Sequence, residues 1–397
     1  MKKIVWIIGL SLTLVLCSCS NEDYLNAIPR NSIALISIDV NRMDTSSTLF
    51  SEFDGCGIDL DTKVFLFETT EGSFGLCARI EDADALRKWL KKKSEQGECE
   101  QVIERKGISF ALYHRAWQMG FNDNTLLVLG PIIATQQSQS QLQIATYLKQ
   151  DEKRGIRESR MYQRLDSLDA PVSMVVQTAA LPEKFVAPFM LGAPADADAS
   201  QVLIAAKLSV ADSVLHIDGN TFSFNKRIEN ALRSSDQILH TLEGTYLESF
   251  NEDDQFCIMM NANGKQLLPL LHENKGLKAL MAGMNLTVNF DSILNTVDGD
   301  MVFRVNDQKP SFLANNKTIV SSNNSLTSKV PHDTMTSRTM SETRTTPLVG
   351  EQMVRNKRLF MLIQLNSLGE EISTTAASFL EPLFGHISTI VYTQGNE

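Results

Sequence analysis

Two pairs of aspartates, each separated by one residue, are the side chains of this chain that could most directly do chemistry. Asp59 and Asp61 form one pair, and Asp298 and Asp300 form the other. Carboxylates at this spacing in a turn can bind calcium, and two opposed carboxylates are the usual machinery of glycoside hydrolysis. Neither segment continues into an EF-hand loop, and Asp298-Gly299 fits a simple turn before a strand. We therefore predict no metal site and give neither pair a catalytic role.

The six histidines do not form a recognisable site either. No two of them have the spacing of a zinc pair, and His272-Glu273 lacks the second histidine of a zincin motif. His114 and His216 fall on predicted strands, where a structural histidine is the more frequent finding. Nucleophile-elbow, phosphate-binding and dinucleotide-binding motifs are missing from the sequence. We assign no catalytic residue and no cofactor, and we favour a non-catalytic protein while leaving enzymatic activity open.

Four cysteines in the body of the chain are too widely spaced for a zinc or redox motif. Cys77 and Cys257 lie inside apolar runs, where a free cysteine behaves as a small hydrophobe, so we expect buried thiols there. Cys56 and Cys99 can form a disulfide if the chain is exported, and the sequence leaves that pairing open.

The first twenty residues carry the features of an export signal. Two lysines precede an apolar stretch over residues 4–16, which is too short to span a bilayer. The stretch ends in Leu16-Cys17-Ser18-Cys19, which resembles the lipobox of bacterial lipoproteins. The resemblance implies that Cys19 is acylated with fatty acids such as palmitate and becomes the mature N-terminus, which would anchor the chain in a membrane. Cys17 is the alternative modified residue, although the bulky Leu16 precedes it.

The residues after Cys19 indicate a location. Ser20 stands where an aspartate would signal retention in the inner membrane, so we expect an outer-membrane lipoprotein on either the periplasmic or the surface-exposed face. The acidic run through Asp23 resembles a surface-export signal of Bacteroidetes lipoproteins, and it fits a solvated tether equally well. Removal of residues 1–18 would leave 35 basic and 47 acidic residues, a net charge of −12.

Composition excludes several classes of protein. The 397 residues are 43% apolar and 21% charged, as in ordinary globular proteins. The net charge of −10, without a dense basic stretch, would repel a phosphate backbone, so we expect no nucleic-acid partner. No apolar stretch beyond the N-terminus approaches about 18 residues, which excludes a polytopic membrane protein.

A short apolar strand followed by a helix recurs four times along the chain. The strand signals cover residues 34–39, 172–177, 256–261 and 359–364. The helices expected after them lie near residues 40–53, 181–190, 265–271 with 277–282, and 368–383. Further strand signal follows each helix, and a separate amphipathic helix is expected over residues 82–96. We predict an α+β protein of repeated β-α-β-β modules, with mostly antiparallel sheets and helices packed on one face.

One segment departs from this pattern. Twenty of the 49 residues in 309–357 are Ser, Thr or Asn, a composition that buries too little apolar area to offset chain ordering, so we predict a flexible insertion. Thr334, within Asp333-Thr334-Met335, matches an O-glycan attachment pattern of Bacteroidetes and is a candidate site of modification.

The expected organisation is a signal peptide over 1–18, an acidic tether over 19–31, α+β domains over 32–150 and 151–308, the insertion over 309–357, and a strand–helix–strand over 358–397 that completes the second domain.

The segment from Cys19 to Asp39, with Ile28-Pro29-Arg30-Asn31-Ser32 before the first strand, resembles Bacteroidetes lipoproteins of a domain-of-unknown-function family. The resemblance extends along most of the chain and carries over no catalytic residue. It implies a membrane-anchored lipoprotein whose α+β body serves binding or envelope assembly, with an unknown protein or glycan as its ligand. The alternative is a cell-envelope hydrolase acting on glycans or peptides.

Overall fold

The computed structural model describes most of the chain as two compact units. The described residues are 22–43, 53, 55–250, 254–278, 289–306, 309–315, 317–320, 328–329, 350–365 and 384–395. Those up to Ser167 belong to the first unit and those from Leu168 belong to the second. The first unit therefore includes residues 151–167, which the sequence analysis placed in the second domain. No helix in the described part is both long enough and apolar enough to cross a membrane.

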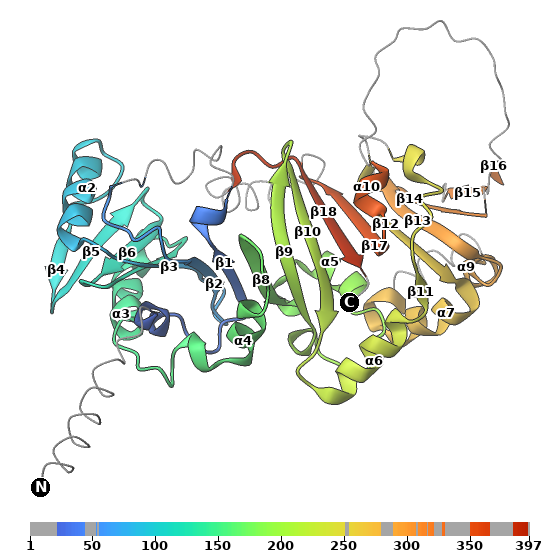
Figure 1. Ribbon diagram of the computed structural model, residues 1–397, viewed down its shortest axis with the longest axis horizontal. Coiled ribbons are helices and arrows are strands. Elements are labelled where there is room, and N and C mark those ends of the chain that lie inside the picture. Colours follow the sequence, from blue (N-terminus) through green and yellow to red (C-terminus); the bar gives the residue numbers. More distant parts are fainter. Residues whose placement is uncertain are drawn as a thin grey trace, which may run out of the picture. The chain divides into compact units, whose positions relative to one another are not determined.

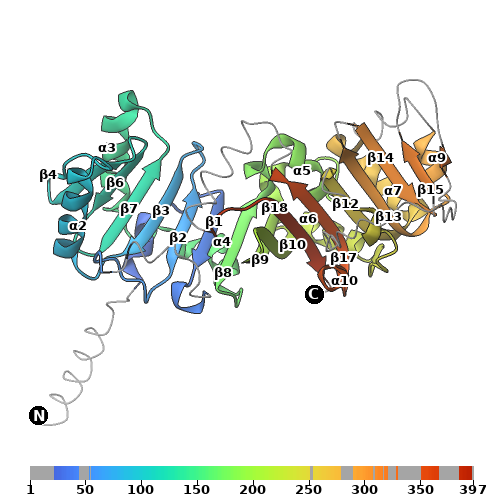
Figure 2. The same cartoon turned by 90° about the horizontal axis from the view of Figure 1, so that it is seen from above.

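An antiparallel sheet forms the centre of the first unit (Figures 1 and 2). Its strand order is β1-β2-β3-β7-β6-β5-β4. The strands are β1 (Ala34–Ile38), β2 (Val64–Glu68), β3 (Phe74–Arg79), β4 (Ile103–Arg105), β5 (Ile108–Tyr113), β6 (Trp117–Phe121) and β7 (Thr125–Gly130). Strands β4 to β7 follow one another along the chain as a four-strand antiparallel meander.

Helices cover both faces of this sheet. On one face, Leu86 and Leu90 of α2 (Ala83–Glu95) are fully buried in a cluster with Phe121. On the other face, a Cβ added to Gly120 would lie 2.4 Å from the Ile144 side chain of α3 (Gln137–Tyr147). Because neighbouring residues of β6 point to opposite faces, α2 and α3 lie on opposite sides of the sheet (Figure 1). This arrangement differs from the single helical face that we expected.

The N-terminal residues of the first unit are part of its core. The 3₁₀ turn η1 (Asp23–Ala27) buries Tyr24 and Leu25, and Ile28 after it has no exposed surface. The Tyr24 hydroxyl donates to the Lys63 carbonyl at 2.7 Å. The second face of the sheet also holds η5 (Ile156–Glu158) and α4 (Arg160–Asp166), which contact η1 and β1 respectively. Four residues within the acidic tether predicted over 19–31, namely Tyr24, Leu25, Ala27 and Ile28, are therefore part of the core.

The second unit is built on a longer sheet. Its strand order is β8-β9-β10-β18-β17-β12-β13-β14-β15-β16, antiparallel throughout except for the parallel pair β10–β18 (Figure 2). The strands are β8 (Val172–Gln177), β9 (Leu203–Ala211), β10 (Val214–Phe222), β12 (Asp254–Asn263), β13 (Asp298–Asn306), β14 (Lys309–Ala314), β15 (Lys317–Val320), β16 (Ser328–Lys329), β17 (Lys357–Gln364) and β18 (Thr389–Gly395). The two-residue strand β11 (Leu239–His240) pairs with the end of β12.

Apolar clusters pack against both faces of the second sheet. Met259 belongs to a cluster that includes Leu247 of η8 (Leu247–Ser249) and Val354 of α10 (Glu351–Val354). The next residue, Met260, packs against a cluster with α7 (Gly264–Glu273) and α9 (Phe290–Leu294). The described part of this unit also contains the helices α5 (Glu183–Phe189) and α6 (Lys226–Asp236). The α+β class predicted from the sequence is confirmed.

The four repeated strands are confirmed as β1, β8, β12 and β17. Each pairs antiparallel with the next strand of its predicted module, namely β2, β9, β13 and β18. The helices predicted near 181–190 and 265–271 correspond to α5 and α7. Residues 40–42 form a short 3₁₀ turn, η2 (Val40–Arg42), and most of the helix predicted over 40–53 lies outside the described residues. The helix predicted over 368–383 and residues 279–282 of the one predicted over 277–282 also lie outside them.

The predicted insertion begins later than expected. Residues 309–314 form β14, which pairs along β13 and buries Phe312 and Leu313. Phe312 meets the ring of Phe290 edge-on at 4.8 Å. Averaging the composition over 49 residues hid this short apolar run, so the inclusion of residues 309–314 in the predicted insertion was wrong. Residues 321–327 and 330–349 lie outside the described residues.

Candidate functional site

An open acidic groove in the first unit brings several chemistry-bearing side chains together. Its volume is about 830 Å³. The groove is lined by the carboxylates of Asp59, Asp61, Glu81, Asp82, Asp84 and Asp123, together with Arg87. The first two were singled out in the sequence, and the others come from the start of α2 and from the turn before β7. A cavity of this size falls within the range of small-ligand sites.

Asp59 is held in place by bonds to its own loop and to the sheet. One carboxylate oxygen lies 3.1 Å from the Arg79 guanidinium, at the end of β3. The other accepts a hydrogen bond from the Asp61 amide at 3.0 Å. Asp61 in turn accepts a bond from the side-chain amide of Asn41 at 3.2 Å. The Asp59–Asp61 pair therefore fastens the loop before β2.

The acids at the start of α2 also have structural partners. The Asp82 carboxylate caps the helix by accepting from the amides of Asp84 and Ala85, each at 2.9 Å. Asp84 binds the Arg87 guanidinium at 2.8 Å, and Asp123 lies 3.8 Å from the same group. Among the described residues, no three His, Cys, Asp or Glu side chains are placed so that they could hold a metal ion. The groove offers carboxylate oxygens to a cationic or hydroxyl-bearing ligand, although Asp59, Asp61, Asp82 and Asp84 each use at least one oxygen to bind the protein itself.

The second aspartate pair has a different role from the turn that we predicted. Asp298 and Gly299 lie within β13 and pair with Asn263 and Ala262 of β12, so the turn assignment was wrong. The Asp300 carboxylate is buried and accepts from the amides of Glu243 at 3.1 Å and Thr245 at 2.9 Å. This carboxylate fixes the loop that covers one face of the second sheet.

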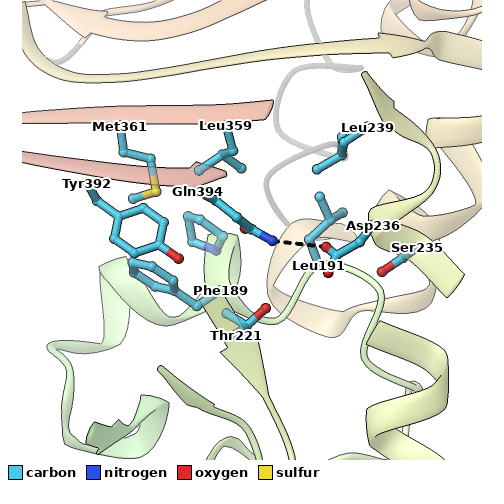
Figure 3. A pocket seen from close by; sticks show the side chains of 11 residues that line it. Phe189, Leu191, Thr221, Ser235, Asp236, Leu239, Leu359, Met361, Tyr392 and Gln394 are labelled. Carbon is cyan, nitrogen blue, oxygen red and sulfur yellow. Dashed lines mark hydrogen bonds between the residues drawn. The ribbon is translucent and has the colours of Figure 1, made fainter. Parts of the chain in front are cut away.

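A second, much smaller cavity lies in the second unit among α5, α6, β10, β17 and β18 (Figure 3). Its volume is about 20 Å³, enough for roughly one water molecule. The side-chain amide of Gln394 donates to the Asp236 carboxylate at 3.0 Å across this space. The Tyr392 hydroxyl donates to the Gly219 carbonyl at 3.0 Å, and its ring meets Phe189 edge-on at 4.9 Å. Burial raises the pKa of Tyr392 above its usual range.

The histidines in the described part of the chain are dispersed in the structure, as they are in the sequence. His216 lies on β10, where burial lowers its pKa, whereas His114 lies just after β5 in a turn with a φ of +46°. His272 Nε2 lies 3.1 Å from the Asp291 carboxylate and links the end of α7 to α9. No spacing pattern in the sequence indicates this pair, because the two residues are 19 positions apart and on different helices.

The cysteines of the body are all buried thiols. Cys77 donates to the Tyr24 carbonyl at 3.3 Å and Cys99 donates to the Leu90 carbonyl at 3.2 Å. The prediction for Cys77 and Cys257 is confirmed, and the disulfide that the sequence allowed between Cys56 and Cys99 is not formed. Cys19, Cys17 and Thr334 lie outside the described residues.

Comparisons with known proteins give one family match. A family model described as "Domain of unknown function (DUF4836)" matches residues 47–325. No curated protein matches the chain. A solved structure described as "Structure of crystal form IV of TP0453" is similar with 9% sequence identity and a TM-score of 0.30, over 48% of this chain and 76% of that one. A likeness this weak defines neither the fold nor a ligand for this chain.

Proposed function

The chain belongs to the family of domains of unknown function DUF4836, which covers more than half of its length, and on that premise we propose that it is an exported lipoprotein. Cys19 carries the lipid anchor in an outer membrane. The two α+β units form a body that binds a protein or glycan ligand, or serves envelope assembly, without catalysis.

The observation that carries this proposal is the N-terminal sequence. Two lysines, an apolar run over residues 4–16 and Leu16-Cys17-Ser18-Cys19 together match the pattern of a cleaved and acylated leader. The packing of η1 supports the same reading. The folded body begins within a few residues of Cys19, as expected where the leader ends and the mature protein starts.

The cavities favour binding over hydrolysis. A space of about 20 Å³ beside Tyr392 is far too small for a sugar or a peptide. The acidic groove has sufficient volume, but Asp59 is paired with Arg79 and Asp82 caps α2. A general acid or base must be available to exchange a proton with its substrate. Carboxylates committed to holding a loop and a helix suit a recognition surface better than a proton-transfer site.

Metabolic labelling with a palmitate analogue tests the anchor. We expect the wild-type chain and Cys17→Ser to be labelled and to fractionate with membranes, because Cys19 follows a small residue in both. Cys19→Ser should lose the label and leave the membrane fraction. A labelled Cys19→Ser chain, or an unlabelled wild-type chain, would contradict the assignment.

A separate experiment tests the absence of catalysis. The purified acylated chain is incubated with envelope glycans and peptides, and Asp59→Asn and Asp61→Asn variants are assayed beside it. We expect no product above the level given by the heat-denatured chain. Turnover that either substitution abolishes would replace the binding role with a hydrolase acting at the acidic groove.

A further inference from the structure

The surface formed by α3 and the residues around it is unlike the rest of this acidic chain. Residues 131–148 contain no Asp, Glu, Lys, Arg or His, although a fifth of the whole chain is charged. Ile133 and Leu142 in this stretch are 64% and 69% exposed. Most of the other outward residues are glutamine, serine, threonine or alanine. We call residues 131–148, together with Ile103 of β4, the α3 surface.

Exposed apolar side chains gather on this surface. Of the four large apolar side chains that are exposed in the described part of the chain, three are Ile103, Ile133 and Leu142. Ile103 pairs with Phe110, and Phe110 pairs with Gly120, which faces α3. Ile103 therefore belongs to the face of the sheet that α3 covers. An uncharged surface with several exposed apolar side chains is typical of a region that contacts something other than water.

The same face of the sheet holds the N-terminal end of the folded body. Cys77 bonds the Tyr24 carbonyl of η1, and Cys77 pairs across the sheet with Leu127, which pairs with Gly120. Paired residues of neighbouring strands share a face. Hence η1 and α3 cover one face of the first sheet, and both contact β7.

The segment of the chain that connects this face to the anchor is very short. Only Ser20 and Asn21 separate Cys19 from Glu22, so the Cα atoms of Cys19 and Glu22 are at most about 11 Å apart. After Glu22 the chain is fixed, because Tyr24, Leu25 and Ile28 are buried. A lipid on Cys19 would therefore hold the η1–α3 face of the first unit close to the bilayer surface.

The chemistry of the α3 surface fits that position. Charged side chains lose hydration at a membrane surface, whereas amide, hydroxyl and apolar side chains enter the headgroup region at lower cost. The two acids nearest the anchor share one cationic partner, since Glu22 and Asp23 lie 3.5 and 3.7 Å from the Arg157 guanidinium, which offsets part of their negative charge. On the β4 side, Arg105 donates to Gln141 at 3.1 Å and Glu100 accepts from Gln137 at 2.9 Å, so the charged groups that contact this surface lie at its β4 edge.

We propose that the α3 surface rests on the lipid headgroups of the bilayer that holds the acyl anchor, with Ile133 and Leu142 inserted at its boundary. This inference relies on the lipidation of Cys19 proposed above. We favour a lipid surface over a second copy of the chain or another protein as the group that covers the α3 surface. The short segment between Cys19 and Glu22 would hold this face close to the bilayer, and no comparable tether would bring a second protein to it.

A fluorescent probe on the α3 surface tests the proposal. The acylated full-length chain carries Leu142→Cys or Gln139→Cys on α3, and Lys91→Cys on α2 serves as the control on the opposite face of the sheet. An environment-sensitive dye will attach to these positions selectively, because the four cysteines of the body are buried. All three replaced side chains are exposed, so we expect the urea unfolding midpoints to match that of the parent chain.

The labelled chains are bound to vesicles of phosphatidylethanolamine and phosphatidylglycerol that contain a lipid-attached quencher. An inserted side chain lies about 5–10 Å into the boundary between headgroups and acyl chains, so we expect a blue shift and at least about twofold quenching at positions 142 and 139. The dye at position 91 should show neither change.

Other outcomes overturn the proposal and separate its two steps. If the protein floats with the vesicles but the dye at position 142 behaves like the dye at position 91, the anchor stands and the docking of α3 is refuted. A blue shift without quenching by the lipid-attached group would mean that protein, and not lipid, covers the surface. If the chain does not float with the vesicles, the anchor and the docking both fail.

Discussion

Gly57 provides a sharp test of how the acidic groove is built. Its φ of +94° lies in a region that L side chains rarely adopt, and an added Cβ would lie 2.1 Å from the Asp82 carbonyl oxygen. The Gly57 carbonyl also accepts bonds from the amides of Glu81 and Asp82, at 2.9 and 3.1 Å. The loop is therefore held against the start of α2 so closely that a methyl group does not fit.

The chain offers a matched control in Gly55. Its φ is +67°, and an added Cβ would meet nothing within 4 Å. Gly55→Ala should therefore cost only the backbone strain of a positive φ, about 1–2 kcal/mol. Gly57→Ala adds overpacking against a backbone carbonyl, about 1–3 kcal/mol, so we expect a total of about 2–5 kcal/mol.

Tryptophan fluorescence during urea unfolding measures the difference. Trp89 and Trp117 both lie in the first unit, and the remaining tryptophan, Trp6, is in the predicted leader, so the mature chain reports on the first unit alone. With a slope of about 2 kcal/mol per molar urea, Gly57→Ala should unfold roughly 0.5–1.5 M earlier than Gly55→Ala. Equal midpoints for the two variants would refute the proposed close contact.

Three further predictions follow from the described contacts. Asp82→Ala removes the cap of α2 and should lower the stability of the first unit by about 0.5–2 kcal/mol in the same titration, whereas Asp84→Ala, which loses an exposed ion pair, should change it by less than about 1 kcal/mol. The four cysteines of the body should react with a thiol reagent only after unfolding, because all are buried and burial raises the pKa of three of them. Rapid reaction in the native chain would contradict this prediction. Burial also raises the pKa of Tyr392, so the folded chain keeps a proton that the unfolded chain releases near pH 10. The thermal unfolding midpoint should therefore fall as the pH rises above about 10, and it should fall less steeply in Tyr392→Phe. Equal slopes for the two chains would argue against this cause.

Local patterns predicted the elements of the fold well. The runs that became β1, β8, β12 and β17 are short, apolar and bounded by polar residues, and the amphipathic pattern of α2 was also visible. The run Ser311–Ala314 is equally apolar, but its position beside a Ser/Thr-rich stretch concealed it. The pairing of β10 with β18 could not be predicted, because these strands are far apart in sequence and no local signal selects a partner.

The candidate site was predictable only in part. Asp59 and Asp61 stood out by their spacing, but their structural use depends on Arg79, which the sheet brings alongside. The bond between Gln394 and Asp236 joins residues 158 positions apart, so no spacing rule could reveal it. Spacing identifies candidate residues, whereas the chain fold decides whether their oxygens are available to a ligand.

The mass of the intact chain, purified from its own membrane fraction, tests the central claim most directly. We predict a polypeptide that lacks residues 1–18 and carries fatty acyl mass on Cys19 at its N-terminus. A chain that keeps residues 1–18, or that begins elsewhere without a lipid, would contradict the anchor and everything proposed from it.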